Sequence, residues 1–239
     1  MVKNEIKYCF SDFTHEEYKK LLEKAQKEYI FRFFDDFSKQ ENFILWRHDV
    51  DGSLEAALEL AKIEAELGVM STYFLLLHSD FYNLFDYHSK GIVKQIIGLG
   101  HQIGLHFDTT YYDIKGEEGL KYWLKKECGF LESIFGCRIN VFSFHNPNPI
   151  SMKWDDWKYA GKINTYAKYF QEEVKYCSDS NGIWRFDKIN NVLNPKINPQ
   201  LQILTHPMWW TEKVASPKEK VKNTIQEKAN YIEAFYDNI

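Results

Sequence analysis

The sequence is poor in cysteine and has neither a long apolar run nor an excess of basic residues. Its four cysteines form no C-x-x-C pair, which argues against a thiolate zinc cluster. No stretch approaches the length of a membrane span, and residues 1–8 lack the apolar core of a signal peptide. The net charge of -4 at pH 7 gives no basic footprint for nucleic acid or an anionic membrane. We therefore expect a soluble, cytoplasmic protein with no nucleic-acid partner and no membrane span.

Internal repeats, low-complexity tracts and linkers are also missing, so nothing in the sequence divides the chain into many units. A length of 239 residues suits one α/β domain, or at most two small ones. Hydrophobic residues make up 44% and charged residues 27%, as in globular proteins. Aromatic residues reach 17%, which is high. Core packing explains most of them, but aromatic rings also line sugar-binding clefts.

Apolar, strand-like runs alternate along the chain with segments that have helical periodicity. This alternation predicts a mostly parallel sheet with right-handed crossovers, packed between helices. The clear strands are expected at 43–47, 71–77, 101–107, 138–144 and 201–205, with shorter ones at 162–166 and 182–186 and an uncertain one within 30–37. The helices are expected at 14–28, 53–67, 90–99, 117–135 and 217–236.

Four of the apolar runs stop at a histidine or an aspartate. They span residues 43–51, 103–108, 141–145 and 201–206. α/β folds build their active sites at the carboxyl ends of their strands, where the ends of different strands converge. The pattern therefore predicts an enzyme, and the residue types indicate that it uses a metal.

The first of these strand ends reads His48-Asp49-Val50-Asp51. A strand has a period of two, so Asp49 and Asp51 point the same way if the strand persists. Two neighbouring carboxylates repel each other unless a cation lies between them. A divalent metal resolves this conflict, whereas a helix cap followed by a solvated turn is the simpler alternative.

Histidines supply the other candidates. His106 ends its strand and is expected to bind metal, while His101 begins the same strand and is expected to be structural. Neutral imidazole suits zinc, iron, cobalt or nickel. His145, fixed by the proline-containing loop after it, is expected to bind the metal or substrate. His206 is well placed as a general acid, because the pKa of histidine lies near neutrality.

Three further residues are expected to contact substrate. Asp80 and Tyr82 lie in a polar and aromatic loop after the strand that precedes His78. Trp209, together with its neighbour Trp210, could stack on a sugar ring, and core packing is the alternative for both.

Taken in order, these residues resemble the polysaccharide deacetylase superfamily, of the NodB-homology or carbohydrate esterase family 4 type. The string from Arg47 to Asp51 resembles the first family motif, and Gly100-His-Gln-Ile-Gly-Leu-His106 is the most specific match. Residues 142–147 occupy the place of a third motif, and Leu204-Thr-His206 resembles the late Leu-x-His motif. The His-Asp-Val-Asp signature is similar to a divergent branch found among bacterial surface-polysaccharide biosynthesis proteins.

The resemblance implies a distorted (β/α)7 barrel of the NodB-homology type over residues 43–239, preceded by a helical extension at 1–42. It implies a metal-dependent deacetylase that removes an acyl group from an N-acylated sugar. Asp49 would be the general base, Asp51 and His106 metal ligands, and His206 the general acid. The expected cofactor is a divalent metal, zinc first, with nickel, cobalt, iron or manganese as alternatives.

The sequence also departs from the family pattern. Thr110 stands where the family has its second metal-binding histidine, and Val50 splits the usual aspartate pair. We expect His145 to supply the missing imidazole, with Asp108 and His48 as alternatives. Two rival functions remain open: a non-catalytic carbohydrate-binding or scaffold protein, which Thr110 favours, and another metal-dependent sugar hydrolase or isomerase.

Overall fold

The computed structural model describes residues 9–237, so the predicted absence of a signal peptide at residues 1–8 lies outside the described part. Its strands are β1 (Ile30–Phe31), β2 (Phe43–Val50), β3 (Thr72–Leu76), β4 (Gln102–Phe107), β5 (Val141–Phe144), β6 (Lys158–Tyr159), β7 (Lys162–Asn164), β8 (Lys175–Ser178) and β9 (Gln200–Thr205). Its α-helices are α2 (His15–Ala25), α3 (Leu54–Glu66), α4 (Tyr87–Gly98), α5 (Glu117–Phe135), α6 (Lys168–Glu172), α7 (Ile189–Val192) and α8 (Pro217–Asp237). Short 3-10 turns include η4 (Ser180–Gly182) and η5 (Pro207–Trp209).

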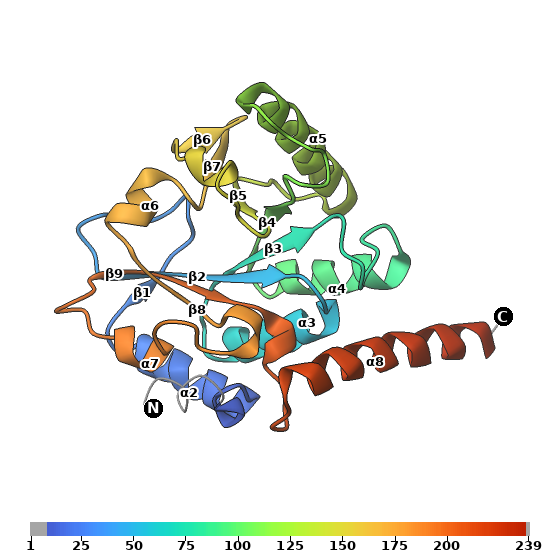
Figure 1. The fold of residues 1–239 in the computed structure, drawn as a ribbon. Helices are drawn as coiled ribbons and strands as arrows, with labels where there is room; N and C mark the ends of the chain where they lie inside the picture. Colours follow the sequence, from blue (N-terminus) through green and yellow to red (C-terminus); the bar gives the residue numbers. More distant parts are fainter. Residues whose placement is uncertain (1–8, 238–239) are drawn as a thin grey trace.

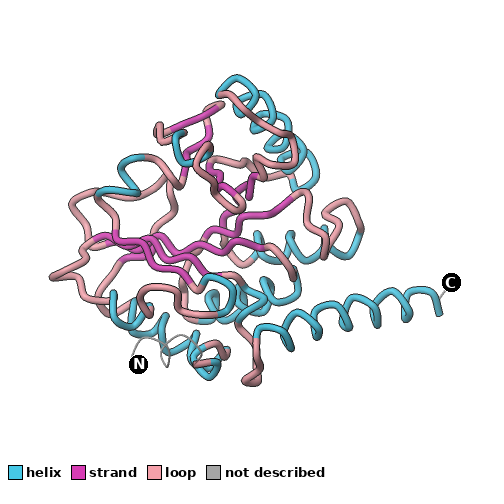
Figure 2. Tube along the Cα trace, in the orientation of Figure 1, coloured by secondary structure: helices cyan, strands magenta, loops and turns pink. Residues whose placement is uncertain are grey.

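The strands form one sheet in the order β6-β7-β5-β4-β3-β2-β9-β8, with β1 added beside β2. All neighbours run parallel except β6 and β7. The sheet curls, and the helices cover its outer side (Figure 1; Figure 2). The predicted α/β class and distorted barrel are therefore confirmed, with the barrel left open between β8 and the edge formed by β6 and β7.

The sheet is buried on both sides, as its apolar runs predict. Along β2, Ile44 and Trp46 pack outward against the layer that contains α2 and α7. Phe43 and Leu45 point inward, to a cluster that also holds Phe74 of β3. This inner cluster fills the barrel toward the amino ends of the strands. Polar residues line the barrel at the carboxyl ends of the strands.

Helix boundaries follow local signals in the sequence. The hydroxyls of Thr14 and Ser53 accept hydrogen bonds from backbone N–H groups in the first turns of α2 and α3. Helix α5 ends at Gly136, whose positive φ of 69° suits glycine. Each of these ends lies close to its predicted position.

One strand prediction was wrong. Residues 182–186 were expected to form a strand, but the strand in this region is β8, at Lys175–Ser178. The ring of Trp184 stacks instead on Phe13, with centroids 4.9 Å apart, and its indole N–H donates to Asp12 at 2.9 Å. The apolar run at 182–186 therefore packs against the N-terminal region rather than in the sheet.

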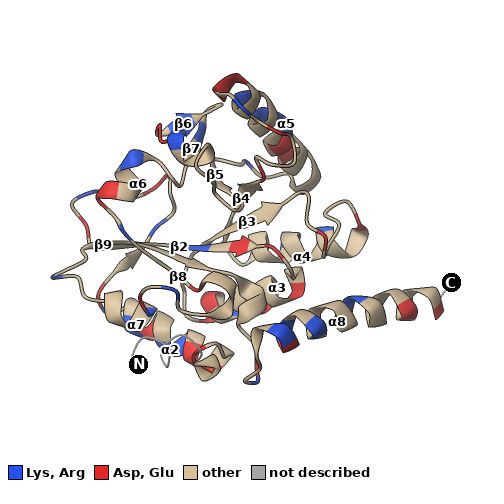
Figure 3. Ribbon diagram, in the orientation of Figure 1, with Lys and Arg blue, Asp and Glu red and all other residues tan. Residues whose placement is uncertain are grey.

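The outside of the molecule carries charges of both signs. Figure 3 shows basic and acidic residues interspersed along α5 and α8, consistent with the small net charge.

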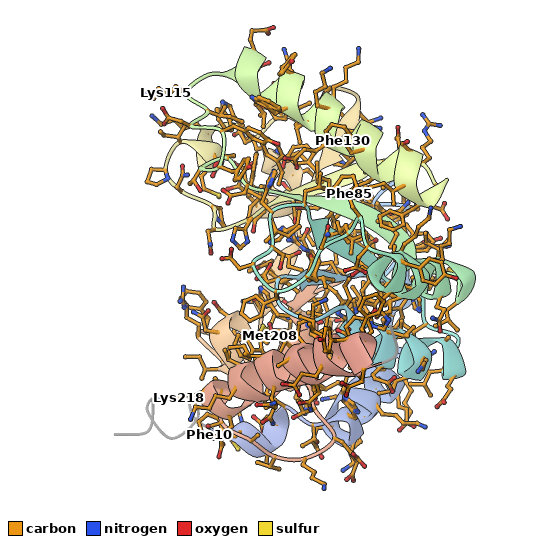
Figure 4. The ribbon with its side chains drawn as sticks, turned by 90° about the vertical axis from the view of Figure 1, so that its right-hand side faces the viewer. Phe10, Phe85, Lys115, Phe130, Met208 and Lys218 are labelled. Atoms are coloured by element: carbon orange, nitrogen blue, oxygen red, sulfur yellow. The ribbon has the colours of Figure 1, made fainter. Side chains whose placement is uncertain are left out.

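No helix within residues 9–237 is both long and apolar enough to cross a membrane. The turn η5, which contains Met208, contacts α8, and α8 extends away from the body at its far end (Figure 1; Figure 4).

Candidate active site

Strand β2 and the residue directly after it place three charged side chains on the inner face of the barrel. Arg47, Asp49 and Asp51 follow one another at the strand period of two. The guanidinium of Arg47 donates to both oxygens of Asp49 at 2.6 and 2.7 Å, and to Thr165 at 2.9 Å. Both side chains of the pair are buried. Burial alone would raise the pKa of Asp49, but the charge of Arg47 and its hydrogen bonds lower it, so this carboxylate is held ionised and in one orientation.

Three potential metal donors converge beside this pair. Asp51 follows β2, His106 lies on β4 and His145 follows β5, and one ligand atom from each lies within 4.8 Å of the others. Asp51 Oδ1 is 3.2 Å from His106 Nε2 and 3.5 Å from His145 Nδ1. This oxygen is buried and makes no hydrogen bond to any residue that the structure describes. An orphaned carboxylate oxygen facing two imidazoles fits a divalent cation.

The environment of His106 sets which ring nitrogen faces the cluster. Its Nδ1 lies 2.7 Å from the hydroxyl of Ser143, a buried residue of β5. That hydroxyl in turn donates to Asp49 Oδ1 at 3.4 Å. Because Ser143 donates to Asp49, it accepts from Nδ1–H of His106, which leaves Nε2 unprotonated toward the cluster. Metal-binding histidines are commonly oriented in this way.

His145 is aimed into the site by the turn that follows it. Asn146 adopts a positive φ of 44°, a conformation that asparagine tolerates better than most residues. Its amide lies 2.8 Å from Nε2 of His145, so Nδ1 points inward. Burial would lower the pKa of His145, but the nearby carboxylate of Asp51 raises it. His145, which the sequence predicts as the third donor, therefore lies beside Asp51 and His106.

His206, just after β9, faces the cluster from the other side. Its Nδ1 lies 2.6 Å from Asp179 Oδ1, and its Nε2 lies 3.8 Å from Asp51 Oδ2. Asp179 is buried and also accepts from the indole N–H of Trp210 at 2.8 Å. Burial would lower the pKa of His206, but the charge and hydrogen bond of Asp179 raise it to about 9. The imidazole is thereby held in one orientation with its Nε2 toward the cleft.

These groups line one cleft of about 390 Å³. Asp49, Asp51, His106, His145 and His206 all lie along it, so the structure brings together the predicted catalytic and metal-binding residues. Trp209 lines the same cleft, whereas Trp210 is fully buried and packs against Phe13 and Tyr18.

Several other candidates are placed elsewhere. Asp80 is exposed and Tyr82 is buried, and neither lines this cleft. The hydroxyl of Tyr82 donates to the carbonyl of Val50 at 2.5 Å and accepts from the N–H of Leu76 at 3.0 Å, so it braces two strand ends.

The alternatives to His145 as third ligand also lie outside the cluster. Asp108 accepts hydrogen bonds from the hydroxyl and N–H of Thr110, at 2.6 and 2.8 Å, and closes its own loop. His48 points to the outer side of β2, where it lies 2.7 Å from Glu64 and 2.8 Å from Thr205. His101 also lies on the outer side, bonded to Ser71 and a backbone carbonyl, as expected of a structural residue.

Sequence reasoning missed three residues that shape the site: Arg47, Ser143 and Asp179. The strand period carried a signal for Arg47 and Ser143, since it places Arg47 on the face of Asp49 and Ser143 two residues before His145. Asp179 could be found only by placing β8 correctly, because it is the residue that directly follows this strand.

No family model and no curated protein matches this chain. Among solved structures, the chain is similar to a family 4 carbohydrate esterase from Bacillus anthracis, with 15% identity, a TM-score of 0.49 and coverage of 89% of this chain and 86% of that one. A chitin deacetylase from the fungal pathogen Colletotrichum lindemuthianum has 14% identity, a TM-score of 0.47 and coverage of 84% and 86%. A family 4 pseudoenzyme from Bacillus anthracis has 13% identity, a TM-score of 0.43 and coverage of 81% and 63%.

The first and third of these structures carry the name of carbohydrate esterase family 4, the family that the sequence motifs resemble. All three TM-scores are below 0.5, and these similarities carry no function over to this chain.

Proposed function

We propose that this protein is a metal-dependent deacetylase that hydrolyses the amide of an N-acylated sugar. The observation that carries the proposal is the convergence, in one cleft, of a three-donor cluster, an oriented carboxylate and an oriented histidine. We further propose that it acts in the cytoplasm, in bacterial surface-polysaccharide biosynthesis, as the sequence resemblance implies.

Asp51, His106 and His145 would hold the cation, with zinc as the first candidate and nickel, cobalt, iron or manganese as alternatives. When bound at such a site, a divalent cation lowers the pKa of water and polarises a carbonyl. The chain's own contribution is to orient the two imidazoles, His106 through Ser143 and His145 through Asn146.

Asp49 is the proposed general base. Its carboxylate lies 3.7 Å from His106 Nε2, so it borders the donor cluster without being one of the three donors. A base must be ionised before it can accept a proton, and Arg47 keeps Asp49 ionised by lowering its pKa. The paired hydrogen bonds from Arg47 also fix the direction in which the carboxylate faces.

His206 is the proposed general acid. Its Nδ1 is engaged by Asp179, so a proton on Nε2 is the one that faces the cleft. Donation of that proton to the sugar nitrogen would turn a poor leaving group into a neutral amine. General acid–base steps of this kind typically contribute roughly 10²–10⁴-fold in rate. Trp209 lines the cleft beside His206 and offers an aromatic face for the sugar ring.

The test is release of free carboxylic acid, acetate in the simplest case, from N-acylated sugars incubated with the purified, zinc-loaded protein. Asp49→Asn should lower the rate at least about 100-fold while metal content stays unchanged, because it removes the base and no metal donor. Asp108→Asn is the matched control, an aspartate engaged by its own loop, and should retain wild-type rates.

Two results would decide between the rivals. A rearranged sugar with no free acid would indicate an isomerase, and protein that never retains metal would favour a carbohydrate-binding scaffold. Near-normal turnover by Asp49→Asn would exclude Asp49 as the base.

A further inference from the structure

Helix α8 is held to the body of the molecule mainly near its start. Within Pro217–Asp237 the one buried residue is Lys220, whose ammonium donates to the backbone carbonyls of Phe13 and Trp209. The remaining residues are half-buried or exposed, and the far end of the helix projects beyond the barrel (Figure 1; Figure 4). Most helices in proteins are stabilised by packing of an apolar face, and α8 packs little of its own length within the chain.

One face of α8 lies over α4. The ring of Tyr231 stacks on His88, with centroids 4.5 Å apart, and Lys228 Nζ lies 3.9 Å from a carboxylate oxygen of Asp86. Thr224 and Glu227, on the same face, line the cavity between α8 and α3. This face is polar and accounts for the contacts of α8 with the body beyond its first turns.

A second face of α8, roughly a quarter turn around the helix axis, carries an apolar residue at every helical repeat. Its side chains lie beside the contact with the body and not opposite it, so a second helix could lie alongside α8 without meeting the barrel. Ile225, Ile232 and Tyr236 on this face are 56%, 55% and 76% exposed. We call this face the apolar stripe of α8, and it consists of Val221, Ile225, Ala229, Ile232 and Tyr236.

Charges of both signs occur in each half of α8, but in opposite proportions. Residues 217–226 contain three lysines and one glutamate, whereas residues 227–237 contain one lysine and three acidic residues. A parallel copy of the helix would place like halves together, and an antiparallel copy places each basic half beside an acidic half. With four charges of each sign, the helix also lacks the excess of lysine and arginine typical of helices that lie on anionic membranes.

We propose that α8 pairs antiparallel with α8 of a second copy of this chain, through the apolar stripe, and so forms a two-fold symmetric dimer. A two-fold axis near Ala229 brings Ile225 of each copy beside Ile232 of the other. The small side chain of Ala229 lets the two helices approach closely at the centre. Such an interface is self-complementary, so it closes with two copies.

One charge pair exists only in this arrangement. Lys222 and Glu233 lie on the same flank of the apolar stripe, and the antiparallel pairing brings Lys222 of each copy close to Glu233 of the other. Within one helix the two residues are separated by about 16 Å along the axis, too far for contact. No residue of α8 lines the catalytic cleft, so the dimer leaves that cleft open and does not depend on the proposed function.

Sedimentation velocity of the full chain from about 1 to 100 µM measures the association directly. The wild type should shift from monomer to dimer over this range. Ile232→Glu places a charge at the centre of the interface and should raise the dimer Kd by about 30-fold or more, the effect of a central interface residue. Phe130→Glu is the matched control, because Phe130 is 48% exposed on α5, and it should dimerise like the wild type.

A charge exchange tests the direction of the pairing. Lys222→Glu and Glu233→Lys should each raise the dimer Kd by about tenfold at low salt, because symmetry turns two attractive contacts into two repulsive ones. The double variant Lys222→Glu/Glu233→Lys should return to nearly the wild-type Kd. A double variant that associates less than either single variant would exclude the antiparallel arrangement.

The remaining outcomes separate a dimer from other uses of this helix. Circular dichroism of dilute Ile232→Glu should match the wild type, because Ile232 is exposed within one copy; if that variant does not fold, the charge exchange decides. A wild type that stays monomeric throughout the concentration range overturns the proposal. Binding of a monomeric wild type, but not of Ile232→Glu, to phosphatidylglycerol vesicles would assign the apolar stripe to a lipid surface instead.

Discussion

At the scale of single residues, the proposed third metal donor, His145, is the point that most distinguishes this site. Thr110 occupies the position where the resembled family has a histidine, and its hydroxyl is engaged by Asp108. His145, from a different strand end, lies 3.1 Å from His106 Nε2 through its own Nδ1. The second imidazole of the three-donor cluster thus comes from the end of the neighbouring strand β5.

His145→Ala should therefore weaken zinc binding severely. Loss of groups that merely orient a ligand typically costs about 10–100-fold in metal affinity, and loss of a ligand should cost at least as much. Competition with a chromophoric chelator measures the affinity. Thr110→Ala is the matched control and should bind zinc like the wild type, because its side chain faces its own loop. Equal affinity in His145→Ala and the wild type would contradict the assignment.

The sequence was informative about those residues that stand directly at the end of an apolar, strand-like run. Asp51, His106, His145 and His206 each terminate an apolar run, and the structure brings all four into one cleft. Tyr82 was misleading because a tyrosine in a polar loop has the same local pattern whether it meets substrate or, as here, backbone atoms of two neighbouring strands. The direction of such a side chain depends on long-range packing that no local pattern contains.

At the scale of elements, a glycine in β4 allows the inner layer of the barrel to close under the site. A Cβ at Gly104 would come within 2.6 Å of two ring carbons of Phe74 on β3. That ring packs against the guanidinium of Arg47, whose central carbon is 4.8 Å from the ring centroid. The glycine, the ring and the arginine therefore form a stack that supports Asp49 from below.

Gly104→Ala should destabilise the protein by about 1–3 kcal/mol, the usual cost of overpacking a filled core. It should also lower turnover, since a displaced Phe74 shifts Arg47 and with it Asp49. Urea unfolding measures the first effect, and acid release measures the second. The double variant Gly104→Ala/Phe74→Leu should recover part of the stability.

A second glycine provides the control for that experiment. Gly129 lies inside α5, and a Cβ at this position would meet no atom outside the helix's own backbone within 4 Å. Gly129→Ala should therefore stabilise the protein by roughly 0.5–1 kcal/mol, because alanine loses less conformational freedom than glycine in a helix. If Gly104→Ala proved as harmless as Gly129→Ala, the stack of glycine, ring and arginine would not be a support for Asp49.

Helices were easier to predict than short strands, for physical reasons. Helix α5 has the predicted bounds because its periodicity is long and a glycine with positive φ ends it. Strand β8 is four residues long, and two of its four residues, Lys175 and Ser178, are polar. A strand this short is specified by its pairing with β9, which the local sequence does not encode.

At the scale of the whole molecule, a buried polar network connects the N-terminal helix to the barrel. The carboxylate of Glu64 on α3 accepts from the hydroxyls of Tyr18, Ser71 and Tyr73, and lies 2.7 Å from His48 Nε2. His101 approaches the same carboxylate at 3.6 Å. The network thereby joins α2 of the predicted extension to α3, to strands β2 and β3, and to His101 just before β4, all on the outer side of the barrel.

The topology of the sheet followed from alternation and handedness, but this network did not. Tyr18, Glu64 and His101 lie far apart in the sequence, and each has an ordinary helical or strand context. Their meeting depends on how two helices dock on the sheet. Sequence patterns indicate which face of a helix or strand is buried. They indicate far less well which buried polar groups from different elements will contact one another.

The network makes a definite prediction about stability in acid. Burial would raise the pKa of Glu64, but the charge and hydrogen bond of His48, with His101 and Ser71, lower it to about 2 from an ordinary 4.5. A carboxyl group with a depressed pKa stabilises the folded state fully above its unfolded pKa, and the contribution is lost as the pH falls toward the folded value. The stabilisation is therefore lost as the pH falls from 4.5 to about 2, and the free energy of unfolding decreases by on the order of 3 kcal/mol over this range.

Glu64→Gln tests this by removing the charge while keeping the side chain's shape. Urea unfolding at several pH values should show a large stability gap between wild type and variant at about pH 5, and the gap should narrow as the pH falls through the window. Glu66→Gln is the control: Glu66 lies two residues on, its side chain is 68% exposed, and the variant should follow the wild-type curve at every pH. A gap between wild type and Glu64→Gln that stays constant from about pH 5 to about pH 2.5 would mean that the ionised carboxylate is not what joins the helices to the barrel.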